Sequence, residues 1–374
     1  MRIMNRKFII SGGGTGGHIF PALSIAHEIK KRDPAASILF VGALGRMEME
    51  KIPAAGFPII GLPVEGLKRK LALRNFVVLY KLIISLFKAS GILKTFKPDV
   101  AIGVGGYASG PLLRMAALRK IPSLIQEQNS YAGVTNRLLA KNTAKICVAY
   151  TGMEKYFPEE KIVLTGNPVR EELIQRKISR EKACEHLQIP ADKLVLLVLG
   201  GSLGARTLND SLLSRMDAFE KEHVFVLWQT GKLYYSQIKK ELDGKDLKNV
   251  RYFDFIARMD LAYAVADVIV SRAGAATISE ICLLGKPAIL VPSPNVAEDH
   301  QTKNAMALVR NNAALMIPDH EAREKLVPQT IGLLNNMEQR KILAANAAKM
   351  ALPDAASLIV DEIFKLVKKS EPAG

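Results

Sequence analysis

The sequence predicts an α/β protein with two doubly wound parallel-sheet domains. Short apolar strands alternate with amphipathic helices in the first half of the chain, and the same alternation begins again in the second half. Such alternation is typical of parallel sheets that are covered by helices on both faces. The length of 374 residues also exceeds the usual size of one hydrophobic core, which favours two domains.

The elements of the first half follow from its hydrophobic pattern. We expect strands where apolar residues run together and helices where they recur every three to four residues. The expected strands are 8–11, 37–42, 58–62, 99–104, 123–126, 146–149 and 162–164. The expected helices are 21–32, 47–55 and 73–96, and Pro21 suits the first turn of its helix.

The second half begins after Pro168, where charged, helix-favouring residues appear. The expected strands are 194–199, 224–228, 250–253, 268–270 and 288–291, with a helix over 207–219 and a last helix over 354–368. We therefore divide the chain into an N-terminal domain, 1–168, a C-terminal domain, 169–350, and a terminal helical segment, 351–374.

Composition and charge narrow the class of protein. The three cysteines lie far apart in the sequence, so they fit neither a disulfide framework nor a metal site, and we expect a reduced cytosolic protein. The first apolar run ends after three residues, too short for a signal peptide, and no uninterrupted apolar run reaches transmembrane length. The net charge of +16 indicates an anionic partner, with simple solubility as the alternative.

Four strand-to-helix junctions are rich in glycine or small residues: 11–18, 103–110, 200–206 and 272–280. Glycine lets the backbone approach a ligand, and the N-terminus of the following helix attracts negative charge. Ligands of doubly wound folds bind beyond the carboxyl ends of the strands. We therefore expect all four junctions on a ligand-binding cleft between the two domains.

The first junction, Ser11–His18, is predicted to bind an anion other than a dinucleotide. Its spacing lacks the G-x-G-x-x-G fingerprint, no acidic residue follows the second strand at 42–46, and no Gly-Lys-Ser/Thr is present. His18 is placed at the helix N-terminus, which favours a neutral imidazole that can take a proton from an attacking hydroxyl. The alternative is that His18 only hydrogen-bonds the loop.

The junction at 271–280 predicts a diphosphate and ribose site in the second domain. Its small residues let a phosphate approach, and its hydroxyl groups can donate hydrogen bonds. Glu280, one turn inside the helix, can accept from a ribose diol, although a helical glutamate is more often a solvated surface residue. Ser202 offers a hydroxyl beside backbone N–H groups, and Gln301 starts a later helix. Together these features indicate a nucleotide sugar.

Basic residues concentrate around the long helix of the first half. Lys68–Lys70 and Arg74 precede or begin it, and the helix is apolar around most of its circumference. That pattern is typical of a surface that dips into an anionic bilayer, while a helix buried in the domain core is the alternative. Aromatic residues are scarce and the basic cluster is mixed with aliphatic residues, which argues against nucleic acid.

Six segments resemble, in order, those of the MurG family of bacterial glycosyltransferases. They span nearly the whole chain, and the combination is far more specific than any one segment. The matching segments are Gly13–Ala26, Gly103–Pro111, Gln126–Ala140, Thr165–Arg170, Gly200–Arg206 and Ser271–Glu280.

The resemblance implies a GT-B fold, in which two Rossmann-like domains face a cleft and the terminal segment packs back on the first. It implies an inverting transferase that moves N-acetylglucosamine (GlcNAc) from UDP-GlcNAc to the C4 hydroxyl of the N-acetylmuramyl pentapeptide of undecaprenyl-pyrophosphate-linked lipid I. The product would be lipid II, for peptidoglycan synthesis, cell shape and cell division. The implied location is peripheral, on the cytoplasmic face of the bacterial inner membrane, with the long helix on the anionic surface.

The resemblance also implies roles for individual residues. The implied catalytic residue is His18, and the implied substrate-binding residues are Thr15, Gly16, Gly17, Asn129, Arg170, Ser202, Ile256, Ala275, Ala276, Thr277, Ile278, Ser279, Glu280 and Gln301. Arg170 and Ser202 would lie by the diphosphate, and Ile256 would bind the uracil through its backbone. Glu280 would take the ribose and Gln301 the GlcNAc.

No cofactor and no metal ion is expected. No acidic pair of the DxD kind lies beside the predicted phosphate site, so Arg170, Ser202 and helix dipoles would stabilise the leaving diphosphate. Leu203 stands where the family often has glutamine, and we assign it no polar contact. The alternatives are a transferase with a diacylglycerol acceptor, a UDP-GlcNAc 2-epimerase and a non-catalytic sugar-nucleotide sensor.

Overall fold

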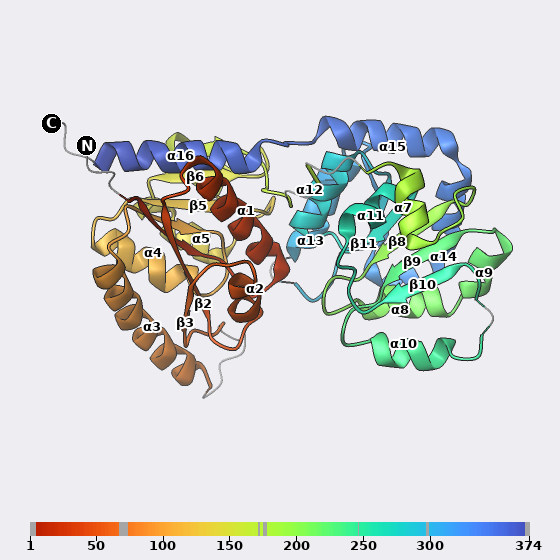
Figure 1. Ribbon diagram of the computed structural model, residues 1–374, viewed down its shortest axis with the longest axis horizontal. Coiled ribbons are helices and arrows are strands. Elements are labelled where there is room, and N and C mark those ends of the chain that lie inside the picture. Colours follow the sequence, from red (N-terminus) through yellow and green to blue (C-terminus); the bar gives the residue numbers. More distant parts are fainter. Residues whose placement is uncertain are drawn as a thin grey trace. The chain divides into compact units, whose positions relative to one another are not determined.

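The chain divides into two compact units, each with its own sheet. The structure, a computed structural model, describes residues 5–66, 74–170, 173–174, 178–245, 247–296 and 299–370. The first unit consists of residues 1–170 together with 352–374, and the second of residues 171–351. The C-terminal segment therefore belongs to the first unit (Figure 1).

The described part of the first unit contains a seven-stranded parallel sheet in the order β3-β2-β1-β4-β5-β6-β7. Its strands are β1 (Lys7–Ser11), β2 (Ser37–Ala43), β3 (Ile59–Leu62), β4 (Val100–Gly103), β5 (Ser123–Glu127), β6 (Lys145–Val148) and β7 (Ile162–Leu164). Its helices are α1 (Gly16–Arg32), α2 (Glu48–Ala54), α3 (Arg74–Phe96), α4 (Ser109–Leu118), α5 (Val134–Leu139) and α16 (Ala355–Ser370), with 3₁₀ turns at Ala140–Asn142 and Glu159–Lys161.

The described part of the second unit contains a six-stranded parallel sheet in the order β10-β9-β8-β11-β12-β13. Its strands are β8 (Val195–Leu199), β9 (Phe225–Gln229), β10 (Val250–Phe253), β11 (Val268–Ser271), β12 (Ala288–Leu290) and β13 (Leu315–Met316). Its helices are α7 (Arg180–Leu187), α8 (Arg206–Leu213), α9 (Met216–Lys221), α10 (Tyr235–Leu242), α11 (Met259–Val265), α12 (Ala275–Leu284), α13 (His300–Val309), α14 (Ala322–Asn335) and α15 (Met337–Lys349), with a 3₁₀ turn at Asp319–Glu321.

Each sheet has a hydrophobic core on both faces, because alternate residues of a strand point to opposite sides. In β1, Phe8 and Ile10 pack with α1 and α16, whereas Ile9 packs with residues of α3 and α4. In β8, Leu197 and Leu196 likewise enter two separate cores. The predicted fold class, two parallel sheets with helices on both faces, is confirmed.

Three expected features of the helices are corrected by the structure. Helix α1 begins at Gly16, so His18 lies inside its first turn and Pro21 lies in its interior. The apolar pattern could not locate this start, because glycines carry no side chain that marks a helix face. The helix expected over 207–219 is two helices, α8 and α9, because the N–H of Arg215 bonds back to Leu212 and ends the α-helical pattern.

Helix α3 combines a buried face with an unusually apolar exposed face. Among the described residues it contains the one segment, Phe76–Phe96, that is long and apolar enough to cross a membrane, and only 22% of its most apolar window is buried. Ala89 and Leu93 pack into the core of the first unit. The exposed residues, called the α3 patch below, are Phe76, Val77, Leu79, Tyr80, Ile83, Ile84 and Phe87.

Two lysines at the margin of the α3 patch bond within the first unit. Lys81 forms an ion pair with Glu65, and Lys88 Nζ donates to the carbonyl of Gly61 over 2.9 Å. Both bonds draw cationic side chains toward the protein, so the centre of the patch is apolar. The expected basic cluster at Lys68–Lys70 lies outside the described residues.

Helix α16 should contribute strongly to the stability of the first unit. Ile363 is fully buried in the core formed with β1 and α1, whereas Leu358 on the same helix is 42% exposed. We expect Ile363→Ala to lower the free energy of unfolding by about 2–5 kcal/mol, because it leaves a cavity. Leu358→Ala should cost less than about 1 kcal/mol. Calorimetric unfolding of both variants tests this, and equal losses would contradict it.

Candidate functional site

The first two glycine-rich loops meet at the carboxyl ends of the neighbouring strands β1 and β4. A Cβ atom added to Gly106 would lie 2.5 Å from the carbonyl oxygen of Gly13, so the two backbones touch. Gly106 also has a φ of +87°, in the region that favours glycine. Any side chain at position 106 would collide with the backbone of Gly13. Glycine is therefore required here by the close contact of the two backbones as well as by its positive φ.

His18 lies between these two loops. Its Nδ1 atom is 3.1 Å from the carbonyl oxygen of Gly13 and 3.4 Å from Thr15 Oγ1. On the opposite edge of the ring, a Cβ added to Gly105 would lie 2.7 Å from Nε2. Gly16 and Gly17 form the start of α1 beside it, and Thr15 is its N-cap. The four consecutive expected residues, Thr15 to His18, thus lie at the start of α1, and His18 contacts the loop after β4.

Asn129 lies in the loop after β5, which neighbours β4. Its backbone N–H and its side-chain Nδ2 both donate to Glu127 Oε1, over 3.0 and 3.3 Å. The other carboxylate oxygen accepts from the N–H of Gly133 and from Asn136 Nδ2. Burial raises the pKa of Glu127 above its ordinary value, and these four donors oppose that rise. Glu127 thus holds the loop that carries Asn129.

Arg170 belongs to the first unit. Its guanidinium lies 4.4 Å from the centre of the Phe20 ring on α1, a cation–π contact. The segment leading to it is fixed by Asn167, which accepts from Gln126 and donates to the carbonyl of Gln128. Arg170 is therefore placed by α1 and by the loop after β5, while Ser202 belongs to the second unit.

Ser202 lies in the loop between β8 and α8. It is half-buried, and its carbonyl accepts from the N–H of Lys232 over 3.2 Å. The same loop contacts the turn after β9, because a Cβ on Gly231 would collide with the backbone of Gly204. The two turns hold each other, so the backbone that presents the Ser202 hydroxyl is fixed.

The first turn of α12 follows β11, the strand beside β8. Gly274 is its N-cap, so the N–H groups of Ala275, Ala276 and Thr277 stand at the positive end of the helix. The next two residues also form hydrogen bonds within the helix. Ile278 is buried and its N–H donates to Gly274, and Ser279 Oγ donates to the carbonyl of Ala275 over 3.0 Å.

Glu280 is a buried carboxylate, although a glutamate one turn inside a helix is usually solvated. Only 4% of the residue is exposed, and its Oε2 accepts from the hydroxyl of Tyr263 over 2.7 Å. Tyr263 lies on α11 and is itself 1% exposed. The hydrogen bond fixes the carboxylate close to the start of α12.

The backbone of Ile256 is already engaged in this structure. Its N–H donates to the side chain of Gln229, at the end of β9, over 2.9 Å. A uracil contact through that N–H would therefore have to displace Gln229, whereas a contact through the carbonyl of Ile256 would leave this bond intact. The sequence did not indicate a role for Gln229. It is the last residue of a buried apolar strand, and no local pattern distinguishes it from other strand residues.

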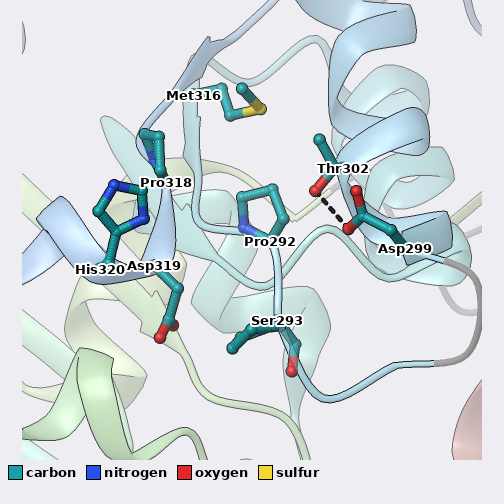
Figure 2. Close-up of a pocket in the computed structure, with 9 residues that line it drawn as sticks. Pro292, Ser293, Asp299, Thr302, Met316, Pro318, Asp319 and His320 are labelled. Atoms are coloured by element: carbon teal, nitrogen blue, oxygen red, sulfur yellow. Dashed lines mark hydrogen bonds between the residues drawn. The ribbon is translucent and has the colours of Figure 1, made fainter.

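A pocket of about 320 Å³ lies in the second unit at the ends of β12 and β13 (Figure 2). Its lining comprises Pro292, Ser293, Pro294, Asp299, Thr302, Met316, Pro318, Asp319 and His320. Gln301 borders it, because Gln301 Oε1 accepts from the N–H of Ser293 over 2.8 Å. Arg272 donates to the carbonyl of Pro292 over 3.2 Å and pairs with Asp319, which holds the rim together.

The described residues contain no group of three or more histidine, cysteine, aspartate or glutamate side chains placed to hold a metal ion. The three cysteines are buried, and burial raises the pKa of Cys147 and of Cys282 to about 12. Neither thiol is therefore a nucleophile at neutral pH.

Sequence reasoning overlooked several buried residues that hold the loops. Tyr263 lies in an apolar stretch that is typical of a core helix. Glu127 lies in the matching segment Gln126–Ala140, in which a binding role was expected only for Asn129. No local pattern marks either residue, because each acts on a partner that only folding brings close.

Both halves of the chain match a known family. Residues 8–148 match the glycosyltransferase family 28 N-terminal domain, and residues 195–359 match its C-terminal domain. Curated relatives from Parabacteroides distasonis and Phocaeicola vulgatus are each 55% identical, over 97% and 98% of this chain and 99% and 97% of the relative. Both are named UDP-N-acetylglucosamine–N-acetylmuramyl-(pentapeptide) pyrophosphoryl-undecaprenol N-acetylglucosamine transferase.

Solved structures show the same fold. MurG of Acinetobacter baumannii superposes with a TM-score of 0.74 at 29% identity, over 96% of this chain and 99% of that one. A UDP-GlcNAc 2-epimerase from Neisseria meningitidis, bound to UDP-GlcNAc, has a TM-score of 0.70 at 15% identity, over 96% and 100% of the two chains. The second similarity is one of fold.

The bond between Tyr263 and Glu280 should stabilise the second unit. Tyr263→Phe removes one donor from a buried carboxylate, and we expect a loss of about 1.5–3 kcal/mol in the free energy of unfolding. Tyr107→Phe removes a hydroxyl from a residue that is 49% exposed and should change stability by less than about 0.5 kcal/mol. Denaturant titration measures both variants, and an unchanged midpoint for Tyr263→Phe would contradict the role of the bond.

Proposed function

Because this chain belongs to glycosyltransferase family 28, we propose that it transfers GlcNAc from UDP-GlcNAc to the C4 hydroxyl of the muramyl sugar of lipid I, giving lipid II. The observation that carries this function is its 55% identity, over nearly the full length of both chains, to relatives named for this transfer. The chain is an N-acetylglucosaminyltransferase of peptidoglycan synthesis.

We propose that the donor nucleotide binds at the carboxyl ends of β8 and β11. The N–H groups at the start of α12 and the hydroxyl of Ser202 suit a diphosphate, since a helix N-terminus attracts negative charge. Glu280 suits the ribose, because a carboxylate can accept from a diol and the hydrogen bond from Tyr263 fixes its position near the start of α12. Gln301 suits the sugar, since it borders the pocket beyond β12.

We propose that the acceptor binds to the loops of the first unit that surround His18. In the transfer, His18 takes the proton of the acceptor hydroxyl while its oxygen attacks the anomeric carbon of GlcNAc. The bond from that carbon to the β-phosphate oxygen breaks, its electron pair leaves with UDP, and the configuration inverts. Arg170, Ser202 and the α12 dipole stabilise the leaving diphosphate, so no metal ion is required.

We propose that the α3 patch contacts the membrane that carries the lipid acceptor, on its cytoplasmic face. Phe76 is 73% exposed and Phe87 is 76% exposed, one near each end of the patch. Exposed large apolar side chains are stabilised when they insert into the bilayer at the boundary between lipid headgroups and acyl chains. The net charge of +16 adds attraction to anionic lipids.

His18→Ala should lower kcat for GlcNAc transfer by about 10²–10⁴, the usual contribution of a general base. The assay follows UDP release and the disaccharide product from UDP-GlcNAc and a lipid I analogue, with and without a chelator. His186→Ala, at an exposed position of α7, is the matched control and should behave as the parent. Full activity of His18→Ala, or loss of activity with the chelator, would contradict the mechanism.

The acceptor distinguishes this function from its nearest rival. With diacylglycerol in place of the lipid I analogue, we expect no glycolipid product, and undecaprenyl-pyrophosphate compounds should inhibit the transfer. Turnover with diacylglycerol alone would assign the chain to a different lipid acceptor.

Replacing both Phe76 and Phe87 by serine should weaken vesicle binding at least about tenfold, because each buried aromatic ring is worth about 1.5–3 kcal/mol. The measurement is co-sedimentation with vesicles of phosphatidylglycerol, compared with phosphatidylcholine. Leu233→Ser, at a 69% exposed position of the second unit, is the control. Unchanged binding of the double variant would exclude the α3 patch as the contact.

A further inference from the structure

A buried carboxylate lies beneath the first glycine-rich loop. Glu48, the first residue of α2, is 1% exposed. Its Oε1 accepts from the N–H of Ala43 over 3.0 Å, and its Oε2 accepts from the N–H of Gly14 over 2.8 Å. One side chain therefore ties the end of β2 to the loop after β1, through two backbone donors.

Two glycines leave the space that this side chain occupies. A Cβ on Gly42 would lie 2.6 Å from Glu48 Cγ, and a Cβ on Gly13 would collide with the carboxylate itself. Neither glycine has a positive φ, so conformation does not require them. Glycine is required at both positions because the Glu48 side chain lies where a Cβ atom would be.

The bond from Gly14 to Glu48 fixes a peptide group that also contacts His18. The N–H of Gly14 and the carbonyl of Gly13 belong to the same planar trans peptide, so they point in opposite directions. The N–H points at Glu48, and the carbonyl oxygen lies 3.1 Å from His18 Nδ1. Holding one end of this peptide group therefore holds the other.

The contact with Gly13 favours a proton on Nδ1 of His18. A carbonyl oxygen only accepts hydrogen bonds, so a bond at this 3.1 Å contact requires the proton on Nδ1, whereas the Thr15 hydroxyl, 3.4 Å away, can either donate or accept. A carboxylate on the far side of the peptide polarises the carbonyl and strengthens it as an acceptor. The nitrogen left to accept a proton in this tautomer is Nε2, the atom that lies against Gly105.

We propose that Glu48 is a positioning residue, which holds His18 in the Nδ1-protonated tautomer through the Gly13–Gly14 peptide group. Glu48 touches no substrate in this arrangement and acts only through the loop. The assignment of His18 as the base rests on the proposed function, whereas the tautomer is a property of the protein without substrate.

The first test is the ¹⁵N NMR spectrum of the histidine side chains in the full-length protein. The chain has six histidines, and the signal lost in His18→Ala identifies His18. We expect a protonated Nδ1 and an unprotonated Nε2 above the titration of the ring. A ring with its proton on Nε2 would overturn the proposal, and this outcome needs no Glu48 variant and no activity.

The second test is Glu48→Gln, which keeps the volume of the side chain but turns one acceptor into a donor. We expect a mixture of His18 tautomers, a 10–100-fold fall in kcat and a change of less than threefold in KM for UDP-GlcNAc. Glu50→Gln, on the same helix with 77% of its side chain exposed, should leave all three unchanged. A less stable protein with an unchanged His18 tautomer would show a merely structural role and overturn the proposal.

A double-mutant cycle shows whether Glu48 acts through His18. In the His18→Ala background, Glu48→Gln should change kcat by less than twofold, because residues that act as a unit are not additive. An equal fold loss in both backgrounds would overturn the proposal. If the parent protein shows no transfer at all, the proposed function fails, while the NMR spectrum still decides the tautomer.

Discussion

Buried side chains that accept hydrogen bonds from the backbone hold the loops at the carboxyl ends of both sheets. A glycine-rich loop has little side-chain packing of its own, and each buried N–H needs an acceptor. Glu48 and Glu127 supply acceptors to loops of the first unit, and Gln229 supplies one in the second. The geometry of His18, Asn129 and Ile256 depends on such bonds.

This arrangement separates the residues that bind or react from those that place them. Asn129 and His18 are half-buried and stand on loops, while Glu127 and Glu48 lie fully buried behind them. Burial raises the pKa of Glu127, and the four donors around its carboxyl group oppose that rise.

Helix α3 shows how far a helical pattern can be interpreted from sequence. Its apolar residues surround most of the helix, and both a membrane surface and a buried core would produce that pattern. The structure divides the helix, since Ala89 and Leu93 pack into the core whereas Phe76 and Phe87 are exposed. One element thus contains both a part that is buried in the core and an apolar part that is exposed. The start of α1 was missed because its first turn contains two glycines.

The sequence by itself determined the fold class and the family. Hydrophobic runs and helical periodicity are local properties of the chain, and the order of the motifs can be read directly along it. It also indicated the glycine-rich loops on which the proposed site is built. Only the tertiary structure decided how those loops are held: Glu48 contacts Gly14 across 34 positions of the chain, and Tyr263 contacts Glu280 across 17. Such contacts leave no periodic or compositional pattern, since they depend on which strands lie side by side and on the space that a glycine leaves.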